Sequence, residues 1–178
     1  EIAHLQFGFY AKPKEIGEVA YLQVKHLDDF GKQSFKVENF IQINKKNKSH
    51  LLEDGDILFV GKGLRNFAWT YYKSFGPAIA SSIFFVIKVD RSKVLPEYLT
   101  TIFNMPLTQA YFHTLGAGSS IPSIRKAELE ALPIQLPSLE VQKKTIAFKI
   151  LYEQDKELSH KILAEKESGI AELKAVGN

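Results

Sequence analysis

The feature that most constrains this chain is its C-terminal stretch, where residues 139–176 contain no proline and a single glycine, Gly169. Ser138 can cap the amino end of a helix, and Gly177 can end one. Apolar side chains recur along the stretch at Ile146, Phe148, Leu151, Leu158, Ile162, Leu163, Ile170 and Leu173. Their spacing predicts one amphipathic helix of roughly 38 residues, which is about 57 Å long at 1.5 Å per residue.

A helix of that length is longer than the rest of the chain is wide, because a domain of about 138 residues has a radius of gyration of about 14 Å. Its outer half must therefore meet a partner or fold back over its own domain. We predict a dimer or partner interface formed by Leu151, Leu158, Ile162, Leu163 and Ile170. A strict heptad would place Asp155 and Glu165 in the seam, so the expected coiled coil is irregular.

The preceding residues have the pattern of a mixed α/β domain with short strands. Apolar runs bounded by turn residues predict strands at residues 19–24, 34–43, 57–60, 67–72, 78–89 and 134–136. We interpret 78–89 as one central strand buried on both faces, and 67–72 as the hairpin partner of 57–60. First-turn prolines predict helices from Pro96 and Pro106, and a short helix is predicted at residues 125–132. We expect an α/β domain with a mixed, largely antiparallel sheet at 1–137, and a helix at 138–178.

Composition excludes several classes of protein. The chain has no cysteine, which excludes disulfides, thiolate metal sites and a cysteine nucleophile, and which suits the cytoplasm. No apolar run approaches the ~18 residues that a membrane span requires, so we expect a cytoplasmic protein with no membrane partner. The chain starts at Glu1 and its only methionine is Met105, so we expect a trimmed chain or a piece of a longer protein.

Charge is unevenly distributed along the chain. The formal net charge of +3 divides into +5 over residues 1–126 and −2 over residues 127–178. A basic body with a slightly acidic tail suits a polyanion as partner of the body and another protein as partner of the tail. A net charge of +5 over 126 residues also lies within the ordinary variation of net charge among proteins, so it does not by itself require a polyanionic partner.

The sequence contains no recognisable catalytic constellation. Its 5 histidines are scattered, with no pair at metal-ligand spacing, and it has no Walker loop. Asp54 and Asp56 precede a predicted strand and could hold Mg²⁺ in a nuclease, but Asp-Gly-Asp is also ordinary turn chemistry. We predict no catalytic residue, no metal site and no cofactor in this chain.

The remaining polar features suit contact with nucleic acid. Lysines fix phosphates, whereas arginine and asparagine supply the bidentate donors that read guanine and adenine edges. A serine-rich turn beside a helix start also favours phosphate. The predicted DNA-binding residues are Lys45, Lys46, Lys48, Lys62, Arg65, Asn66, Lys73, Ser119, Ser120 and Arg125.

The order of several motifs resembles the specificity (S) subunits of type I restriction–modification systems. Leu-Glu-Asp-Gly-Asp-Ile-Leu-Phe at residues 52–59, followed by a glycine loop, is similar to one block of that family. Gly-Ser-Ser-Ile-Pro-Ser-Ile-Arg at 118–125 precedes Leu-Glu-Ala-Leu-Pro-Ile-Gln-Leu-Pro at 129–137, as in the family. Leu-Glu-Val-Gln-Lys-Lys-Thr-Ile at 139–146 resembles the entry into its long spacer helix. The resemblance covers residues 50–150, and the first fifty residues match only loosely.

The resemblance implies a DNA target recognition domain followed by a spacer helix. A full S subunit is similar to two such units in tandem, each reading half of a split double-stranded DNA site. Modification (methyltransferase) subunits carry S-adenosyl methionine and the catalysis, and a separate restriction subunit cleaves, so Mg²⁺ and ATP are expected on partner subunits. This chain has one unit, so it is half of a longer subunit or a natural half-subunit that forms a homodimer through its helix.

Two other functions remain open at this point. The same domain could belong to a free-standing dimeric DNA-binding regulator, with the helix as its dimer stalk. A Mg²⁺-dependent nuclease built on Asp54 and Asp56 is the second alternative.

Overall fold

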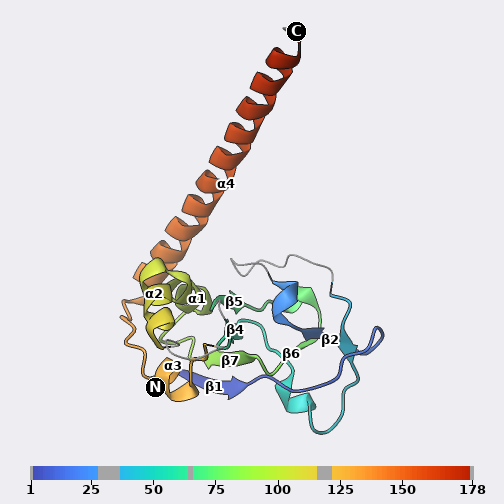
Figure 1. Ribbon diagram of the computed structural model, residues 1–178. Coiled ribbons are helices and arrows are strands. Elements are labelled where there is room, and N and C mark those ends of the chain that lie inside the picture. Colours follow the sequence, from blue (N-terminus) through green and yellow to red (C-terminus); the bar gives the residue numbers. More distant parts are fainter. Residues whose placement is uncertain (1, 28–36, 64–65, 116–121, 177–178) are drawn as a thin grey trace.

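The computed structural model describes residues 2–27, 37–63, 66–115 and 122–176, and only the backbone of residues 169–176. Within these ranges the chain forms a mixed α/β domain with two sheets and short helices (Figure 1). One long helix projects from this domain. The expected fold class is confirmed.

The larger sheet has the strand order β1-β7-β4-β5, and all its pairings are antiparallel. Its strands are β1 (Ala3–Phe7), β4 (Ile57–Val60), β5 (Ala68–Thr70) and β7 (Phe84–Val89). β4 and β5 are the two partners of the predicted hairpin, with Leu58 opposite Trp69. β1 lies in a segment for which the sequence predicted no strand.

The two central strands of this sheet, β4 and β7, are buried on both faces. Successive side chains of a strand point to opposite sides, so each strand contributes to two cores. The face toward the helices carries Ile57, Phe59, Phe85 and Ile87. The opposite face carries Leu58, Val60, Phe84 and Val86. This sheet is therefore the middle layer of the domain.

The smaller sheet contains β3 (Phe40–Ile41), β2 (Val19–Leu22) and β6 (Ala78–Ala80), in that order. β2 is antiparallel to β3 and parallel to β6. The prediction of one continuous strand over 78–89 was wrong. The chain turns after β6, where the Phe84 N–H donates to the Ser81 carbonyl at 3.0 Å, and it enters the larger sheet as β7. The predicted strand at 134–136 was also wrong, because those residues have no regular structure.

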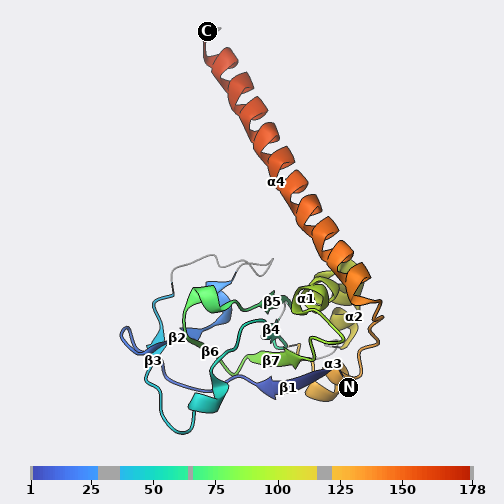
Figure 2. The ribbon, with the colours of Figure 1, turned by 180° about the vertical axis from the view of Figure 1, so that it is seen from behind.

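Three short helices cover one face of the larger sheet, and they confirm the helices predicted from Pro96, from Pro106 and near residue 125. They are α1 (Pro96–Asn104), α2 (Pro106–Leu115) and α3 (Lys126–Glu130) (Figure 2). The Asn104 amide accepts the Ala68 N–H at 2.8 Å and donates to the Ala68 carbonyl at 2.9 Å. α1 thus occupies the open edge of β5, where unpaired backbone groups would otherwise meet solvent or another strand.

The long helix α4 (Leu139–Val176) has the 38 residues predicted for it and rises from the domain as one rod (Figures 1 and 2). Its first turns pack beside α1, and Ile146 reaches the core between the helices and the larger sheet. No helix in the described part of the chain is long and apolar enough to cross a membrane.

One buried side chain joins α4 to the domain. Gln142, in the first turn of α4, is 0% exposed. Its Oε1 accepts the Leu95 N–H, and its Nε2 donates to the carbonyls of Lys93 and Pro137, all at 2.9 Å. One amide therefore satisfies three backbone groups on the two chain segments that meet at the base of the helix.

We predict that Gln142→Ala lowers the free energy of unfolding by about 2–4 kcal/mol, because it removes three hydrogen bonds to partly buried backbone groups and opens a cavity. Gln142→Glu should also destabilise the domain, since a carboxylate cannot donate to the two carbonyls. Urea denaturation measures both effects. Lys143→Ala, at the exposed neighbouring position, should stay within about 0.5 kcal/mol of the parent chain. Equal stability of Gln142→Ala and Lys143→Ala would contradict this role.

Candidate nucleic-acid interface

The segment after β5 presents basic and aromatic side chains on a short 3-10 turn, η3 (Lys73–Phe75). Rings hold this turn in place: Trp69 and Phe75 meet edge to face with centroids 5.1 Å apart, and Tyr72 stacks on Phe75 at 6.4 Å. The turn ends at Gly76, whose φ of 85° lies in the region that favours glycine. Lys73 and Phe75 are left exposed on this turn.

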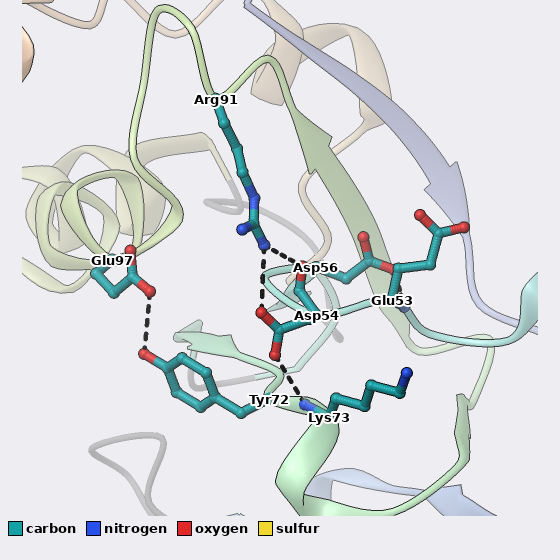
Figure 3. Close-up of polar contacts among 7 residues, drawn as sticks. All are labelled: Glu53, Asp54, Asp56, Tyr72, Lys73, Arg91 and Glu97. Carbon is teal, nitrogen blue, oxygen red and sulfur yellow. Dashed lines mark hydrogen bonds and ion pairs between the residues drawn. The ribbon is translucent and has the colours of Figure 1, made fainter.

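The Asp54 carboxylate fixes η3 to the rest of the domain (Figure 3). Its Oδ1 accepts the Lys73 N–H at 2.9 Å, and its Oδ2 lies 3.6 Å from Nη2 of Arg91. The same guanidinium donates to the Asp54 carbonyl. On the other side of the turn, the Tyr72 hydroxyl donates to Glu97 at 3.3 Å, at the start of α1. Burial, reinforced by the nearby Glu97 charge, raises the pKa of Tyr72 to about 12, so this donor keeps its proton at neutral pH.

Asp56, unlike Asp54, is buried and makes its contacts inside the domain. It is 4% exposed, accepts the Glu53 N–H at 2.9 Å and lies 3.7 Å from Nζ of Lys88. Burial raises the pKa of this carboxyl, against the lowering effect of the backbone donor. In the described residues, no group of three or more His, Cys, Asp or Glu side chains is placed to hold a metal ion. The contacts of Asp54 and Asp56 are those of a turn, and nothing in their arrangement supports the nuclease alternative.

Lys45 and Lys46 lie on a loop built around Asn47, and Lys48 begins the 3-10 turn η2 (Lys48–His50) that follows this loop. Asn47 is 2% exposed, accepts the Asn44 N–H at 2.8 Å and donates to the Gln42 carbonyl at 2.9 Å. Lys45, Lys46 and Lys48 all face solvent. η2 and η3 lie at opposite sides of the smaller sheet (Figures 1 and 2), so these lysines and Lys73 form separate basic regions.

The structure brings Lys62 beside the segment that leads into α3. Lys62 forms a β-bridge with Ser123, and the Ile124 N–H donates to the Gly61 carbonyl at 2.7 Å. Exposed Lys62 and Arg125 thus come from adjacent segments, a proximity that the sequence did not indicate. The Arg125 guanidinium donates to Glu128, at 2.9 Å from Nε, and this bond lowers the pKa of the Glu128 carboxyl.

The side chain of Asn66 hydrogen-bonds to the backbone of its own segment. It is 8% exposed, and its Nδ2 donates to the Val60 carbonyl at 2.7 Å, so the amide holds the loop after β4. Arg65, Ser119 and Ser120, which the sequence also proposed for DNA contact, lie outside the described residues. Sequence inspection missed Lys25, an exposed cation on the 3-10 turn η1 (Val24–His26), because an isolated lysine carries no pattern.

The outer part of α4 carries the predicted apolar stripe. The exposed fractions of Leu151, Leu158 and Ile162 are 63%, 58% and 43%. Leu163 is also exposed, and the side chain of Ile170 lies outside the described residues. At about 100° per residue, Leu151 lies about 180° around the helix from Gln142. Leu158 and Ile162 lie within about 20° of Leu151, so these three side chains face away from the side of α4 that packs on the domain, whereas Leu163 lies about 60° from Gln142 and does not share that face.

Comparison with known proteins gives two findings. A family model described as the type I restriction modification DNA specificity domain matches residues 9–167. A solved structure described as the structural basis of complex assembly and conformational transition of the type I R-M system shares the fold, with a TM-score of 0.72 at 15% identity. The superposition covers 97% of this chain and 41% of that one, so this chain spans less than half its length. No curated protein sequence matches the chain.

We predict that Lys73→Ala and Lys46→Ala each weaken binding to any DNA duplex, because each removes one phosphate contact, and that each reduces the slope of log affinity against log salt by about 1. Fluorescence anisotropy at several salt concentrations measures both quantities. Lys144→Ala, which removes the same charge from an ion pair with Glu140 on α4, is the matched control and should change neither. If one of the two variants behaves like this control, DNA does not contact that basic region.

Proposed function

Because this chain belongs to the family of type I restriction modification DNA specificity domains, we propose that it is the sequence-reading part of a type I specificity subunit. It binds one half of a bipartite double-stranded DNA target and docks a modification subunit. The observation that carries the proposal is the family match over residues 9–167. A projecting helix with an exposed apolar stripe adds support, since it provides a surface for assembly.

We assign DNA recognition and subunit assembly to different parts of the chain. Residues 1–137 form the target recognition domain, whose exposed lysines contact phosphates while Arg65 and neighbouring loop residues are proposed base readers. Residues 138–178 form the spacer and assembly helix. Chemistry belongs to the partners in this proposal: S-adenosyl methionine, Mg²⁺ and ATP are bound by modification and restriction subunits in the cytoplasm, and this chain carries no catalytic residue.

The stripe on α4 supports an isologous contact between two copies. Two helices packed antiparallel along Leu151, Leu158 and Ile162 would each cover the apolar side chains that the other leaves exposed. The two recognition domains would then lie at opposite ends of the helix pair. A homodimer of this kind reads an interrupted palindrome, and a pairing with a different domain reads an asymmetric site.

We predict that modification subunits methylate a defined DNA sequence only when this chain is present, and that the chain alone has no methyltransferase or nuclease activity. Methylation of a randomised duplex library, followed by sequencing of the modified sites, measures this. Lys73→Ala should reduce the yield while leaving the selected sequence unchanged, because it alters a phosphate contact. Specific DNA binding without any effect on methylation would instead favour a free-standing regulator.

We also predict that the isolated chain is a homodimer at tens of micromolar and that Leu158→Glu produces monomers, because it places two desolvated carboxylates in an apolar contact. Sedimentation velocity distinguishes the two states. His160→Glu adds the same side chain on the side of the helix about 160° from Leu158, and it should stay dimeric. A wild-type monomer at this concentration would refute the homodimer and leave the family assignment standing.

A further inference from the structure

The helix α2 and the segments on either side of it carry no formal charge. From Tyr98 to Ile124 the sequence contains no aspartate, glutamate, lysine or arginine over 27 residues, although these residue types make up 24% of the chain. At that average, a run of this length would contain about six of them. Helices on the surface of a globular protein ordinarily direct charged and polar side chains to solvent. The composition of α2 is therefore unusual for a helix that lies on the outside of the domain (Figures 1 and 2).

The solvent-facing side of α2 is largely apolar. The i, i+3, i+4, i+7 spacing that defines one face of a helix is followed by four exposed residues, Leu107, Ala110, Tyr111 and Thr114, hereafter the α2 face. Leu107 is 87% exposed and Tyr111 is 42% exposed. The Thr114 hydroxyl donates to the Tyr111 carbonyl at 2.7 Å, so its hydrogen is used within the helix. Single apolar side chains are normal on a surface, but a group of them on one uncharged face is typical of an interaction site.

The inner side of α2 anchors the helix to the domain. Phe112 is 1% exposed, and its ring centroid lies 5.0 Å from that of Phe59 on β4 and 6.0 Å from that of Phe103 on α1. The Gln109 side chain donates from Nε2 to the Phe103 carbonyl at 2.7 Å. These contacts fix the α2 face before any partner binds. A surface that is already ordered loses little conformational entropy on association, which favours tight binding.

Neither DNA nor a second copy bound through α4 suits the α2 face. DNA binding depends on cations that neutralise phosphates, and α2 contains no lysine or arginine. The exposed lysines of residues 45–48 and Lys73 lie beside the smaller sheet, on the side of the domain away from α2 (Figures 1 and 2). In the proposed antiparallel dimer, the two domains lie at opposite ends of a helix pair about 57 Å long. Each domain therefore leaves the α2 face of the other uncovered.

We propose that the α2 face is the docking surface for a modification subunit, which meets it with an apolar and uncharged surface of its own. A methyltransferase that modifies a base within a half-site must lie next to the recognition domain that holds this half-site. The core of a protein–protein interface is depleted of charge and enriched in tyrosine and methionine, and exposed Met105 directly precedes α2. The inference rests on the proposed function and adds to it the place where the modification subunit binds.

The test compares two variants that each place a glutamate at an exposed aliphatic position. Leu107→Glu changes the α2 face, and Ile16→Glu changes a position just before β2 where the side chain is 83% exposed. Each labelled chain is titrated with purified modification subunit, and fluorescence anisotropy gives the affinity. We expect Leu107→Glu and Tyr111→Ala each to weaken binding at least about thirtyfold, as the loss of a central interface residue does. Ile16→Glu should bind within about twofold of the parent chain.

DNA affinity and urea denaturation distinguish docking from folding. Leu107→Glu should leave both unchanged, because it alters a largely exposed side chain away from the proposed phosphate contacts. Parent-like binding of the modification subunit by both Leu107→Glu and Tyr111→Ala would overturn the role of the α2 face and leave the proposed function intact. An equal loss with Ile16→Glu would also overturn it.

Sedimentation velocity of the same variants tests the other occupant. If Leu107→Glu dissociates an oligomer of the chain, a second copy covers the α2 face and the proposal is wrong. If the parent chain does not bind the modification subunit at all, both the docking surface and the proposed function are overturned.

Discussion

The buried amide of Gln142 is the contact on which the direction of the long helix α4 relative to the domain depends. A helix of 38 residues works as a lever, and a change of about 5° at its base would move a tip about 57 Å away by about 5 Å. Gln142 limits that change because its three hydrogen bonds reach the connection between β7 and α1 on one side and Pro137 on the other. One turn further along, Ile146 packs into the core. The direction of α4 is therefore set by the domain, and not by the helix itself.

The sequence predicted the elements whose apolar residues are regularly spaced or whose ends are marked by proline, glycine or a capping residue. The long helix followed from the absence of proline between Ser138 and Gly177, and α1 and α2 followed from their first-turn prolines. The break between β6 and β7 left no such signal, since both strands are buried on both faces and their side chains show no alternation. Which sheet each strand enters is decided by pairing with distant segments, β2 for one and β1 and β4 for the other.

The sequence indicated residue types suited to DNA contact, but not which of them the fold would bring together. Asn66 and Arg125 have the donors that read bases, yet in this fold Asn66 holds the Val60 carbonyl and Arg125 bonds Glu128. The same hydrogen-bonding groups serve loops and ligands equally well, so residue type alone cannot separate the two uses. Conversely, Lys62 comes close to the segment of Arg125 only through its bridge with Ser123, a pairing that no local motif indicates.

The placement of the stripe on α4 has a consequence for how two proposed recognition domains would meet one duplex. The stripe through Leu151 lies about 180° from Gln142, so a partner helix bound to this stripe would pack on the side of α4 opposite its own domain. In an antiparallel pair the two-fold axis is perpendicular to the plane of both helices, and the two domains project in opposite directions within that plane. A two-fold rotation leaves the direction of its own axis unchanged. Any surface that one domain presents along the axis is therefore presented on the same side by the other, which is the arrangement that a single straight duplex requires.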